Sequence, residues 1–371
     1  MERHAGVLAE SIRLTTGTAR IADARPLVVR FGAMGDMVLV MTLIDALHRR
    51  FGKPVDLLSS GGWLRDLVGS QPGVGRLYLV PSRRRAYWLS PGQWRLATEL
   101  RAEGLPLTWV GDGKAHARRL VRHLGIPDDC VVDIADCPLH AGEHLVDRWL
   151  RFAALAPPAL MSPETTVTTA HVHSAPRLVV QPAWREELER WLESRSLAGQ
   201  RILLIQAGNK RTMRWWARRQ RASNTKYWPE THWARVIDGM LEREPDARVL
   251  TLGVPAEAAL NDDILRLVSR SGALNVAQDL PMSRLLALQE QAGGMISVDT
   301  GPAHSAAALG CPLVVLFGAA DPRQIGPRSA GSPVEILGGP GAGGVGSVTP
   351  AAVLEAWDRI CAAQSAVAAT R

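Results

Sequence analysis

Short apolar runs alternate with longer amphipathic segments along most of this chain. The apolar runs are typical of buried strands, whereas the longer segments place apolar residues every three or four positions, as helices do. The predicted strands are Leu27–Phe31, Val55–Leu58, Arg76–Val80, Leu107–Val110, Ile202–Ile205, Arg248–Gly253, Gly294–Val298 and Pro312–Phe317. The predicted helices are Met37–Phe51, Leu64–Val68, Trp88–Ala102, Ala115–Leu124, His144–Leu155, Trp184–Leu197, His232–Arg243, Ala256–Ser269, Met282–Ala292, Gly301–Gly310 and Pro350–Ala363. Such alternation indicates an α/β fold, with parallel sheets that helices cover on both faces.

The pattern occurs twice, before and after a segment that shows neither periodicity. Residues 156–178 are rich in Pro, Thr, Ser and His, which is typical of a linker. The 371 residues of the chain are enough for two domains. We therefore expect an N-terminal extension at 1–24, a first domain at 25–178 and a second domain at 179–347. Residues 348–371 are expected to form a C-terminal helix, with packing back on the first domain as one option.

The excess of basic residues favours anionic partners. The formal net charge is +7, and several arginines are clustered, among them Arg83–Arg85 and Arg211–Arg221. On charge alone, nucleotides, phosphorylated sugars, nucleic acid and an acidic membrane surface are all candidates. No motif of a nucleic-acid reader is present, so we expect no nucleic-acid partner.

Neither a membrane span nor a secretory signal is indicated. No apolar run approaches the roughly 18–20 residues that cross a bilayer. Residues 1–24 mix charged and polar positions with apolar ones, unlike a secretory signal. The four cysteines show no C-x-x-C spacing. We therefore expect a cytoplasmic protein with reduced thiols.

Two polar turns lie where ligands bind in α/β folds. The turn Asp299–Pro302 places a carboxylate, a hydroxyl and a flexible backbone at a helix N-terminus, which suits a phosphate group. The turn Gly32–Asp36 follows the first apolar strand. Asp36 is interpreted in two ways: as a residue that caps the following helix, or as a general base at the carboxyl edge of the sheet.

Metal and dinucleotide motifs are weak in this sequence. There is no H-E-x-x-H, no pair of cysteine ligands and no Asp-x-Asp, which transferases use to hold a donor diphosphate through a divalent ion. The turn at Gly32 lacks the full G-x-G-x-x-G spacing, and no G-K-[ST] follows a glycine-rich turn. The sequence therefore favours a mechanism without a metal.

Four segments together carry a family resemblance. In chain order they are Gly32–Asp36, Thr225–Pro229, Asp299–His304 and Phe317–Pro322. They resemble glycosyltransferase family 9, the heptosyltransferases of lipopolysaccharide core synthesis, over roughly residues 25–360. The resemblance implies a GT-B architecture, in which two Rossmann-like parallel-sheet domains face each other across a cleft. The acceptor would bind mainly in the first domain and the nucleotide-sugar donor mainly in the second.

The resemblance also implies a chemistry: inverting sugar transfer without a metal or other cofactor, from a nucleotide-diphospho-sugar that we expect to be ADP-linked. Asp36 resembles the family's catalytic base, which deprotonates the acceptor hydroxyl. Lys226 resembles the lysine that binds the donor diphosphate, where an ammonium replaces a metal ion as negative charge develops. Further residues that resemble donor-binding positions are Glu257, Met282, Asp299, Thr300, Gly301 and His304. Glu257 would bind the ribose, and Asp299 would orient the turn or contact the sugar.

Each assignment has a plain structural alternative. Lys226 could be a surface cation, and His304 could be a core histidine. Glu257 could serve as an acid in the first turn of a helix, where an acid is favoured, and Met282 could be a core residue.

Acceptor-side candidates are Gly35, Arg211 and Arg214. The segment between Gly208 and Lys226 is longer and more basic than is usual in the family, and Met41-Thr42 stands where the family has Thr-Pro. We interpret the basic segment as a lid or acceptor grip that leans on the anionic inner leaflet of a membrane.

The expected function is transfer of a sugar, a heptose by resemblance, to a lipopolysaccharide-type or other surface glycan. The alternatives are a nucleotide-sugar epimerase of related two-domain fold and a catalytically inert nucleotide-sugar-binding protein. The expected partners are the donor, a glycan or glycolipid acceptor and, peripherally, the inner membrane.

Overall fold

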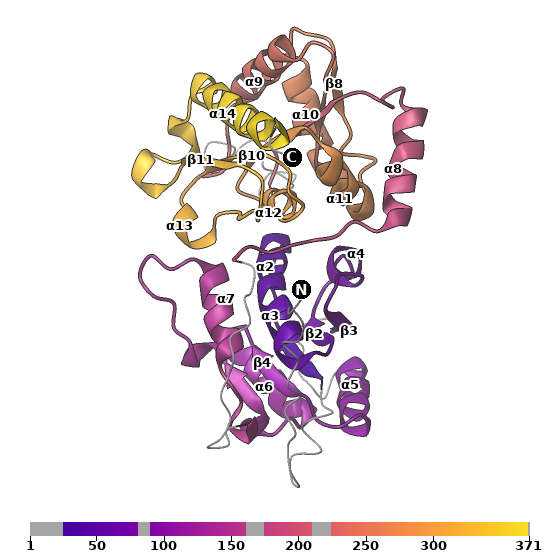
Figure 1. Cartoon of the computed structure of the whole chain (residues 1–371), viewed down its shortest axis with the longest axis vertical. Coiled ribbons are helices and arrows are strands. Elements are labelled where there is room, and N and C mark those ends of the chain that lie inside the picture. The colour runs from indigo at the N-terminus through magenta and orange to yellow at the C-terminus, as the bar shows by residue number, and fades with distance from the viewer. Residues whose placement is uncertain (1–24, 81–89, 161–173, 210–223, 370–371) are drawn as a thin grey trace, which may run out of the picture.

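The computed structural model describes residues 25–80, 90–160, 174–209 and 224–369 of the chain. Two α/β domains lie one above the other (Figure 1). Each contains one sheet whose strands are all parallel. The expected architecture, two Rossmann-like parallel-sheet domains, is confirmed.

The first domain has five strands in the order β3-β2-β1-β4-β5. They are β1 (Pro26–Val29), β2 (Val55–Ser59), β3 (Val74–Leu79), β4 (Leu107–Val110) and β5 (Val131–Asp133). Its helices are α2 (Met34–Leu39), α3 (Met41–Phe51), α4 (Leu64–Val68), α5 (Pro91–Ala102), α6 (Ala115–Leu124) and α7 (Leu145–Ala154). Val29 of β1 pairs with Leu58 on one side and Val110 on the other. The strand order reverses between β1 and β4, and their carboxyl ends form the crevice in which such sheets bind ligands.

The second domain repeats this plan with six strands in the order β11-β10-β9-β6-β7-β8. They are β6 (Ile202–Gln206), β7 (Arg248–Thr251), β8 (Ala273–Asn275), β9 (Gly294–Val298), β10 (Leu313–Phe317) and β11 (Val334–Gly338). Its helices are α8 (Pro182–Ser194), α9 (Glu230–Arg243), α10 (Ala258–Leu265), α11 (Met282–Gln291), α12 (Gly301–Ala308), α13 (Pro322–Ile325) and α14 (Pro350–Ala369). Here the order reverses between β6 and β9. The turn after β9 is Asp299–Pro302, the predicted phosphate site.

Three strands were not predicted from the hydrophobic pattern: β5, β8 and β11. Each is at the edge of its sheet, and most of its residues are only half buried. An edge strand packs on fewer neighbours than a central one, so it needs fewer apolar residues and gives a weaker sequence signal.

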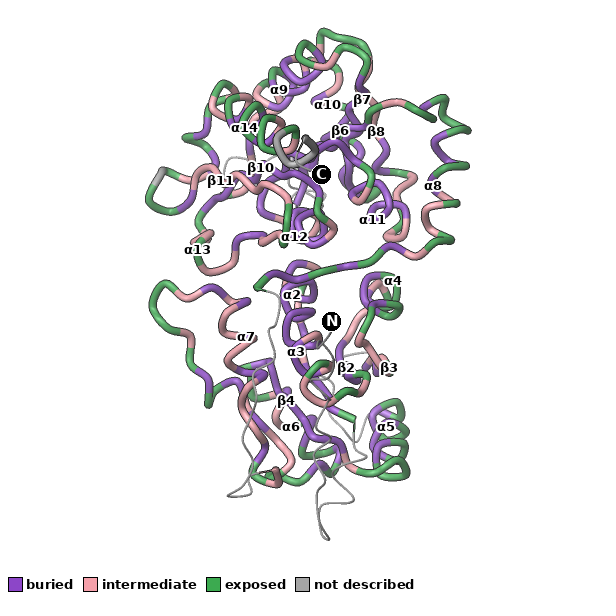
Figure 2. Tube along the Cα trace, in the orientation of Figure 1, coloured by how far each residue is buried: buried purple, intermediate pink, exposed green. Residues whose placement is uncertain are grey.

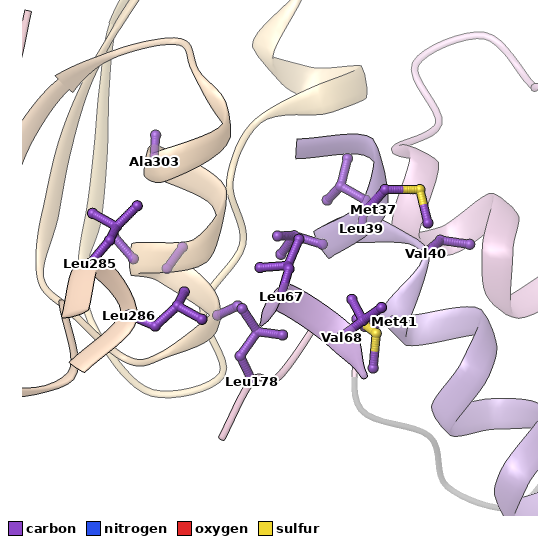
Figure 3. Close-up of a cluster of buried hydrophobic side chains, with 14 of the residues drawn as sticks. Met37, Leu39, Val40, Met41, Leu67, Val68, Leu178, Leu285, Leu286 and Ala303 are labelled. Carbon is purple, nitrogen blue, oxygen red and sulfur yellow. The ribbon is translucent and has the colours of Figure 1, made fainter. Parts of the chain in front are cut away.

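The two domains share one hydrophobic cluster. Figure 3 shows its central part, where Leu39 of α2 and Leu67 of α4 lie near Leu178 of the linker and Leu286 of α11. Central strands and inner helix faces are buried, and exposed residues lie on outer helices such as α5 and α8 (Figure 2). Among the described residues, no helix is both long and apolar enough to span a bilayer.

The C-terminal helix α14 packs on the second domain. Trp357 is buried in that domain's own cluster, and Arg243 of α9 forms an ion pair with Asp358. The option that this helix returns to the first domain is therefore wrong for the described residues. The helix is capped at its start, where the amide of Ala352 donates to the hydroxyl of Thr349 at 3.2 Å.

Candidate functional site

Asp36 lies at the carboxyl edge of the first sheet, in the first turn of α2. One carboxylate oxygen accepts from the amide of Ala33 at 3.0 Å. Ala33, not Asp36, is the residue that precedes the helix, so Asp36 caps α2 from within its first turn. The other carboxylate oxygen accepts from the guanidinium of Arg30 at 2.9 Å. The Asp36 side chain is 38% exposed, which leaves it accessible to a ligand. The capping role and an active role are therefore compatible, because each carboxylate oxygen has a second lone pair.

In the second domain, Lys226 and Asp299 form a tight pair. The ammonium of Lys226 donates to a carboxylate oxygen of Asp299 at 2.5 Å and to the backbone carbonyl of the same residue at 2.7 Å. Asp299 is buried, whereas Lys226 is about one-third exposed. The pair brings together two residues 73 positions apart that the sequence assigned to the donor site.

The backbone around Lys226 is fixed by two asparagines that sequence reasoning missed. Asn224 donates from its amide to the side chain of Asn209, which follows β6, at 3.2 Å. The side-chain oxygen of Asn224 accepts from the backbone amide of Lys226 at 3.1 Å. Both asparagines are buried. Their position at a strand end and two residues before Lys226 was visible in the sequence, but an asparagine alone gives no specific signal.

Thr300 is the residue that precedes α12, and its hydroxyl does not cap that helix. Instead, it donates to the carbonyl of Val298 at 3.2 Å. The first turn of α12 is held by Gln289, whose side chain donates to the carbonyl of Pro302 at 2.8 Å and accepts from Ser305 at 2.7 Å. The positive end of α12 therefore remains directed toward the junction between the domains, as an anion site requires.

Two glycines let the two domains meet at this point. The helices α2 and α12 pack against each other across the junction. A β-carbon on Gly35 would lie 2.7 Å from a ring carbon of His304, and one on Gly301 would lie 2.5 Å from the β-carbon of Met34. Only glycine fits at both positions, because ordinary carbon–carbon contacts are about 3.5–4.0 Å. Gly35, predicted on the acceptor side, is buried against His304.

His304 links the two halves of the site. It is buried, and its Nε2 lies 3.9 Å from Asp299. Burial lowers the pKa of His304 to about 4, and the nearby charges of Asp299 and Asp36 oppose this shift without outweighing it. The ring is therefore neutral at physiological pH. The structure thus brings Asp36, His304, Asp299 and Lys226 into one constellation that spans the junction.

A second buried histidine also bridges the domains. His144, just before α7, accepts at Nδ1 from the amide of Val146, so its Nε2 donates to the carbonyl of Gly326 at 2.8 Å. Burial lowers the pKa of His144. Beside it, the guanidinium of Arg328 forms two hydrogen bonds with Asp147, at 2.6 and 2.8 Å. Sequence reasoning did not predict these contacts.

Glu257 and Met282 lie near other strand ends of the second sheet. Glu257 is buried, accepts from the amide of Val254 at 3.1 Å and packs against Gly208. This is the structural role foreseen as an alternative, and ribose binding stays a prediction. Met282 begins α11 and is partly buried against the shared cluster.

Arg211 and Arg214 lie outside the described residues. Among the residues that the structure describes, no group of three or more His, Cys, Asp or Glu side chains could hold a metal ion. Sequence reasoning also overlooked Arg30, which follows β1 directly and donates a hydrogen bond to Asp36.

A family model described as Glycosyltransferase family 9 (heptosyltransferase) matches residues 198–334. Lipopolysaccharide heptosyltransferase 1 of Escherichia coli K12 is 32% identical over 101 residues, and its counterpart from Pseudomonas aeruginosa PAO1 is 34% identical over 98 residues. These matches cover 27% and 26% of this chain. The chain therefore spans only 30% and 26% of the length of these curated relatives.

Solved structures share the fold over almost the whole chain. A family 9 glycosyl transferase from Veillonella parvula has a TM-score of 0.75 at 15% identity, covering 92% of this chain and 98% of that one. E. coli ADP-heptose heptosyltransferase II has a TM-score of 0.68 at 18% identity, covering 92% and 99%. An E. coli heptosyltransferase with ADP has a TM-score of 0.65 at 19% identity, covering 91% and 99%. The chain therefore carries the sequence pattern of this family within its second domain, and its two-domain fold is similar to that of these solved structures over both domains.

Proposed function

We propose that this protein is an inverting, metal-independent glycosyltransferase that moves a heptose from an ADP-linked donor to a lipopolysaccharide-type glycan. The observation that carries the proposal is the constellation at the junction, where Asp36 of one domain faces the Lys226–Asp299 pair of the other through His304. The family match across the second domain and the ADP or ADP-2-deoxy-2-fluoro heptose in the E. coli heptosyltransferase structures support the choice of donor.

In this mechanism, Asp36 accepts the proton of the acceptor hydroxyl as that oxygen attacks the anomeric carbon of the donor. The bond from the sugar to the diphosphate breaks, and the nucleoside diphosphate leaves with the electron pair. A single displacement of this kind inverts the anomeric configuration. Asp36 is suited to the role because it is partly exposed and its orientation is fixed by two hydrogen bonds.

The second domain would stabilise the leaving group. Lys226 is exposed enough to exchange part of its contact with Asp299 for a phosphate oxygen. The backbone amides at the start of α12 would add to this, because the positive end of a helix attracts an anion. A fixed ammonium beside the departing diphosphate supplies the stabilisation that a divalent cation supplies in other transferases.

The decisive experiment measures transfer by the full chain with ADP-, UDP-, GDP- and CDP-linked sugars and a heptose-free glycolipid acceptor, with and without EDTA. We expect ADP-linked heptose to be used and EDTA to have no effect. Asp36→Asn should lower kcat at least about 100-fold with little change in donor affinity. Asp45→Asn is the matched control, since Asp45 on α3 also pairs with an arginine but lies on the helix surface.

Each alternative gives a different result in this experiment. An inert binding protein would bind donor without transfer, and Asp36→Asn would change nothing measurable. An epimerase would convert the donor sugar without any acceptor. Transfer that disappears with EDTA and returns with a divalent ion would contradict metal independence.

The acceptor and the place of action form a further part of the proposal. We propose that the protein works at the cytoplasmic face of the inner membrane, and that Arg211 and Arg214 bind the anionic acceptor or lipid. Replacing Arg211 and Arg214 by serine should weaken binding to the glycolipid or to anionic vesicles and leave donor binding unchanged. Unchanged binding of both would contradict this part alone.

A further inference from the structure

Arg30 occupies an unusual place beside the proposed base. Its side chain is 18% exposed, and it lies between the carboxyl ends of β1 and β4. One terminal nitrogen donates to the carboxylate of Asp36 at 2.9 Å, and the other donates to the carbonyl of Gly111 at 3.0 Å. The guanidinium also lies 5.5 Å from the ring centre of Trp149, on α7. Three separate elements therefore fix this group.

One of the nitrogen donors of Arg30, Nε, makes no hydrogen bond among the described residues. This nitrogen is also buried. A buried donor without a partner is costly, so an arginine placed only for stability would be expected to use it. Here the two terminal nitrogens are directed to Gly111 and Asp36 at the expense of Nε.

The arrangement fixes the plane of the Asp36 carboxylate. The backbone amide of Ala33 donates to one oxygen, and the guanidinium of Arg30 donates to the other. With both oxygens held, the carboxylate cannot rotate freely about its terminal bond. Each oxygen keeps one lone pair for the acceptor hydroxyl, and the flat, rigid guanidinium determines where these lone pairs point.

We propose that Arg30 is a positioning residue that orients Asp36 for proton abstraction. The inference rests on the proposed function, because it assumes that Asp36 is the base. Arg30 touches no reacting atom in this scheme. It acts through the geometry of Asp36 and is anchored by the carbonyl of Gly111, just after β4, and by the ring of Trp149.

The test compares three substitutions. Arg30→Gln removes the charge and the planar fork. We expect kcat to fall about 10–100-fold with the donor KM within about twofold, because a small misplacement of a catalytic group has an effect of this size. The kcat of Arg30→Lys should lie between those of the wild type and Arg30→Gln, since one ammonium cannot donate to both Asp36 and Gly111 with the same geometry. For Arg30→Ala, millimolar guanidinium should restore part of the lost kcat.

A matched arginine in the same domain controls for stability. Arg50, at the end of α3, donates to the carbonyls of Ala153 and Leu155 and lies 5.2 Å from the ring centre of Phe51. It is therefore a partly buried arginine that contacts carbonyl groups and an aromatic ring but not Asp36. Arg50→Gln should lower the melting temperature and leave kcat unchanged.

The outcomes separate the inference from the proposed function. Wild-type kcat in Arg30→Gln, while Asp36→Asn abolishes transfer, overturns the inference alone. A loss of kcat that follows the melting temperature equally in Arg30→Gln and Arg50→Gln also overturns it, since the role would then be structural. A wild-type protein that transfers no sugar overturns both.

Discussion

Replacing Gly35 by alanine tests the contact on which the site depends. The added β-carbon would lie 2.7 Å from Cδ2 and 3.1 Å from Nε2 of His304. An ordinary contact is about 3.5–4.0 Å, so the two helices must move apart by about 1 Å. The ring of His304 is buried, which leaves it little room to turn away. The substitution therefore acts directly on the junction between α2 and α12.

Two effects of opposite sign determine the result. Overpacking of this kind costs about 1–3 kcal/mol, whereas alanine in place of glycine within a helix stabilises α2 by up to about 1 kcal/mol. The overall free energy of unfolding should therefore fall by about 0–3 kcal/mol. The contact between the domains, however, bears the full cost, which lowers the ratio of closed to open molecules about 5- to 150-fold. We expect transfer to fall by a similar factor while the melting temperature stays within a few degrees.

The assay measures kcat/KM for donor and acceptor together with thermal unfolding. Gly62→Ala is the control, because a β-carbon at Gly62 has open space around it. It should leave both quantities at the wild-type value. Wild-type transfer by Gly35→Ala would show that closure of α2 on α12 has no part in the reaction, and would refute the reasoning.

Three further predictions concern other groups of the site and the core. Lys226→Met should weaken donor binding at least about tenfold and cost about 1–2 kcal/mol of stability, since the buried Asp299 loses its ion pair. Calorimetry measures the donor affinity and urea melts measure the stability. A donor affinity equal to that of the wild type would contradict the prediction. His304 ionises at about pH 4 in the fold but near 6.5 when unfolded, so the protein should lose up to about 3 kcal/mol as pH falls from 6.5 to 4. His304→Gln should remove that part of the loss in urea melts, and an unchanged slope would speak against the buried neutral ring. Burial raises the pKa of Cys311 to about 12, so iodoacetamide at pH 8 should label it only in urea, as mass spectrometry would show; labelling of the native protein would contradict this.

The sequence predicted the central strands and helices well because these elements are fully buried on one or both faces. Their apolar signal is strong, as in Leu313–Phe317, an unbroken apolar run in which every residue is buried. The edge strands β5, β8 and β11 were missed because half-buried positions accept polar residues. The domain on which α14 packs could not be predicted either, because an apolar helix face indicates burial but does not identify the surface that covers it.

Asp36 and Asp299 were singled out because they lie in short polar turns at strand ends, whereas Lys226 was assigned only through the family resemblance. Their pairing was not predictable in detail, since Lys226 and Asp299 meet only once the chain has folded. Arg30, Asn209 and Asn224 gave no signal of their own. Each acts through one hydrogen bond or two to a group elsewhere in the chain, and periodicity carries no information about such contacts.

The linker between the domains is attached to both of them at one place. The side chain of Gln71 exchanges two hydrogen bonds with the backbone of Val179, and the amide of Leu178 donates to Ala308 of α12. If the two domains separate while these bonds are kept, one domain has to rotate relative to the other about this segment, which then acts as a hinge. The bonds of His144 to Gly326 and of Asp147 to Arg328 also join the two domains and oppose such a rotation. A rotation of this kind therefore has to break both of these bonds.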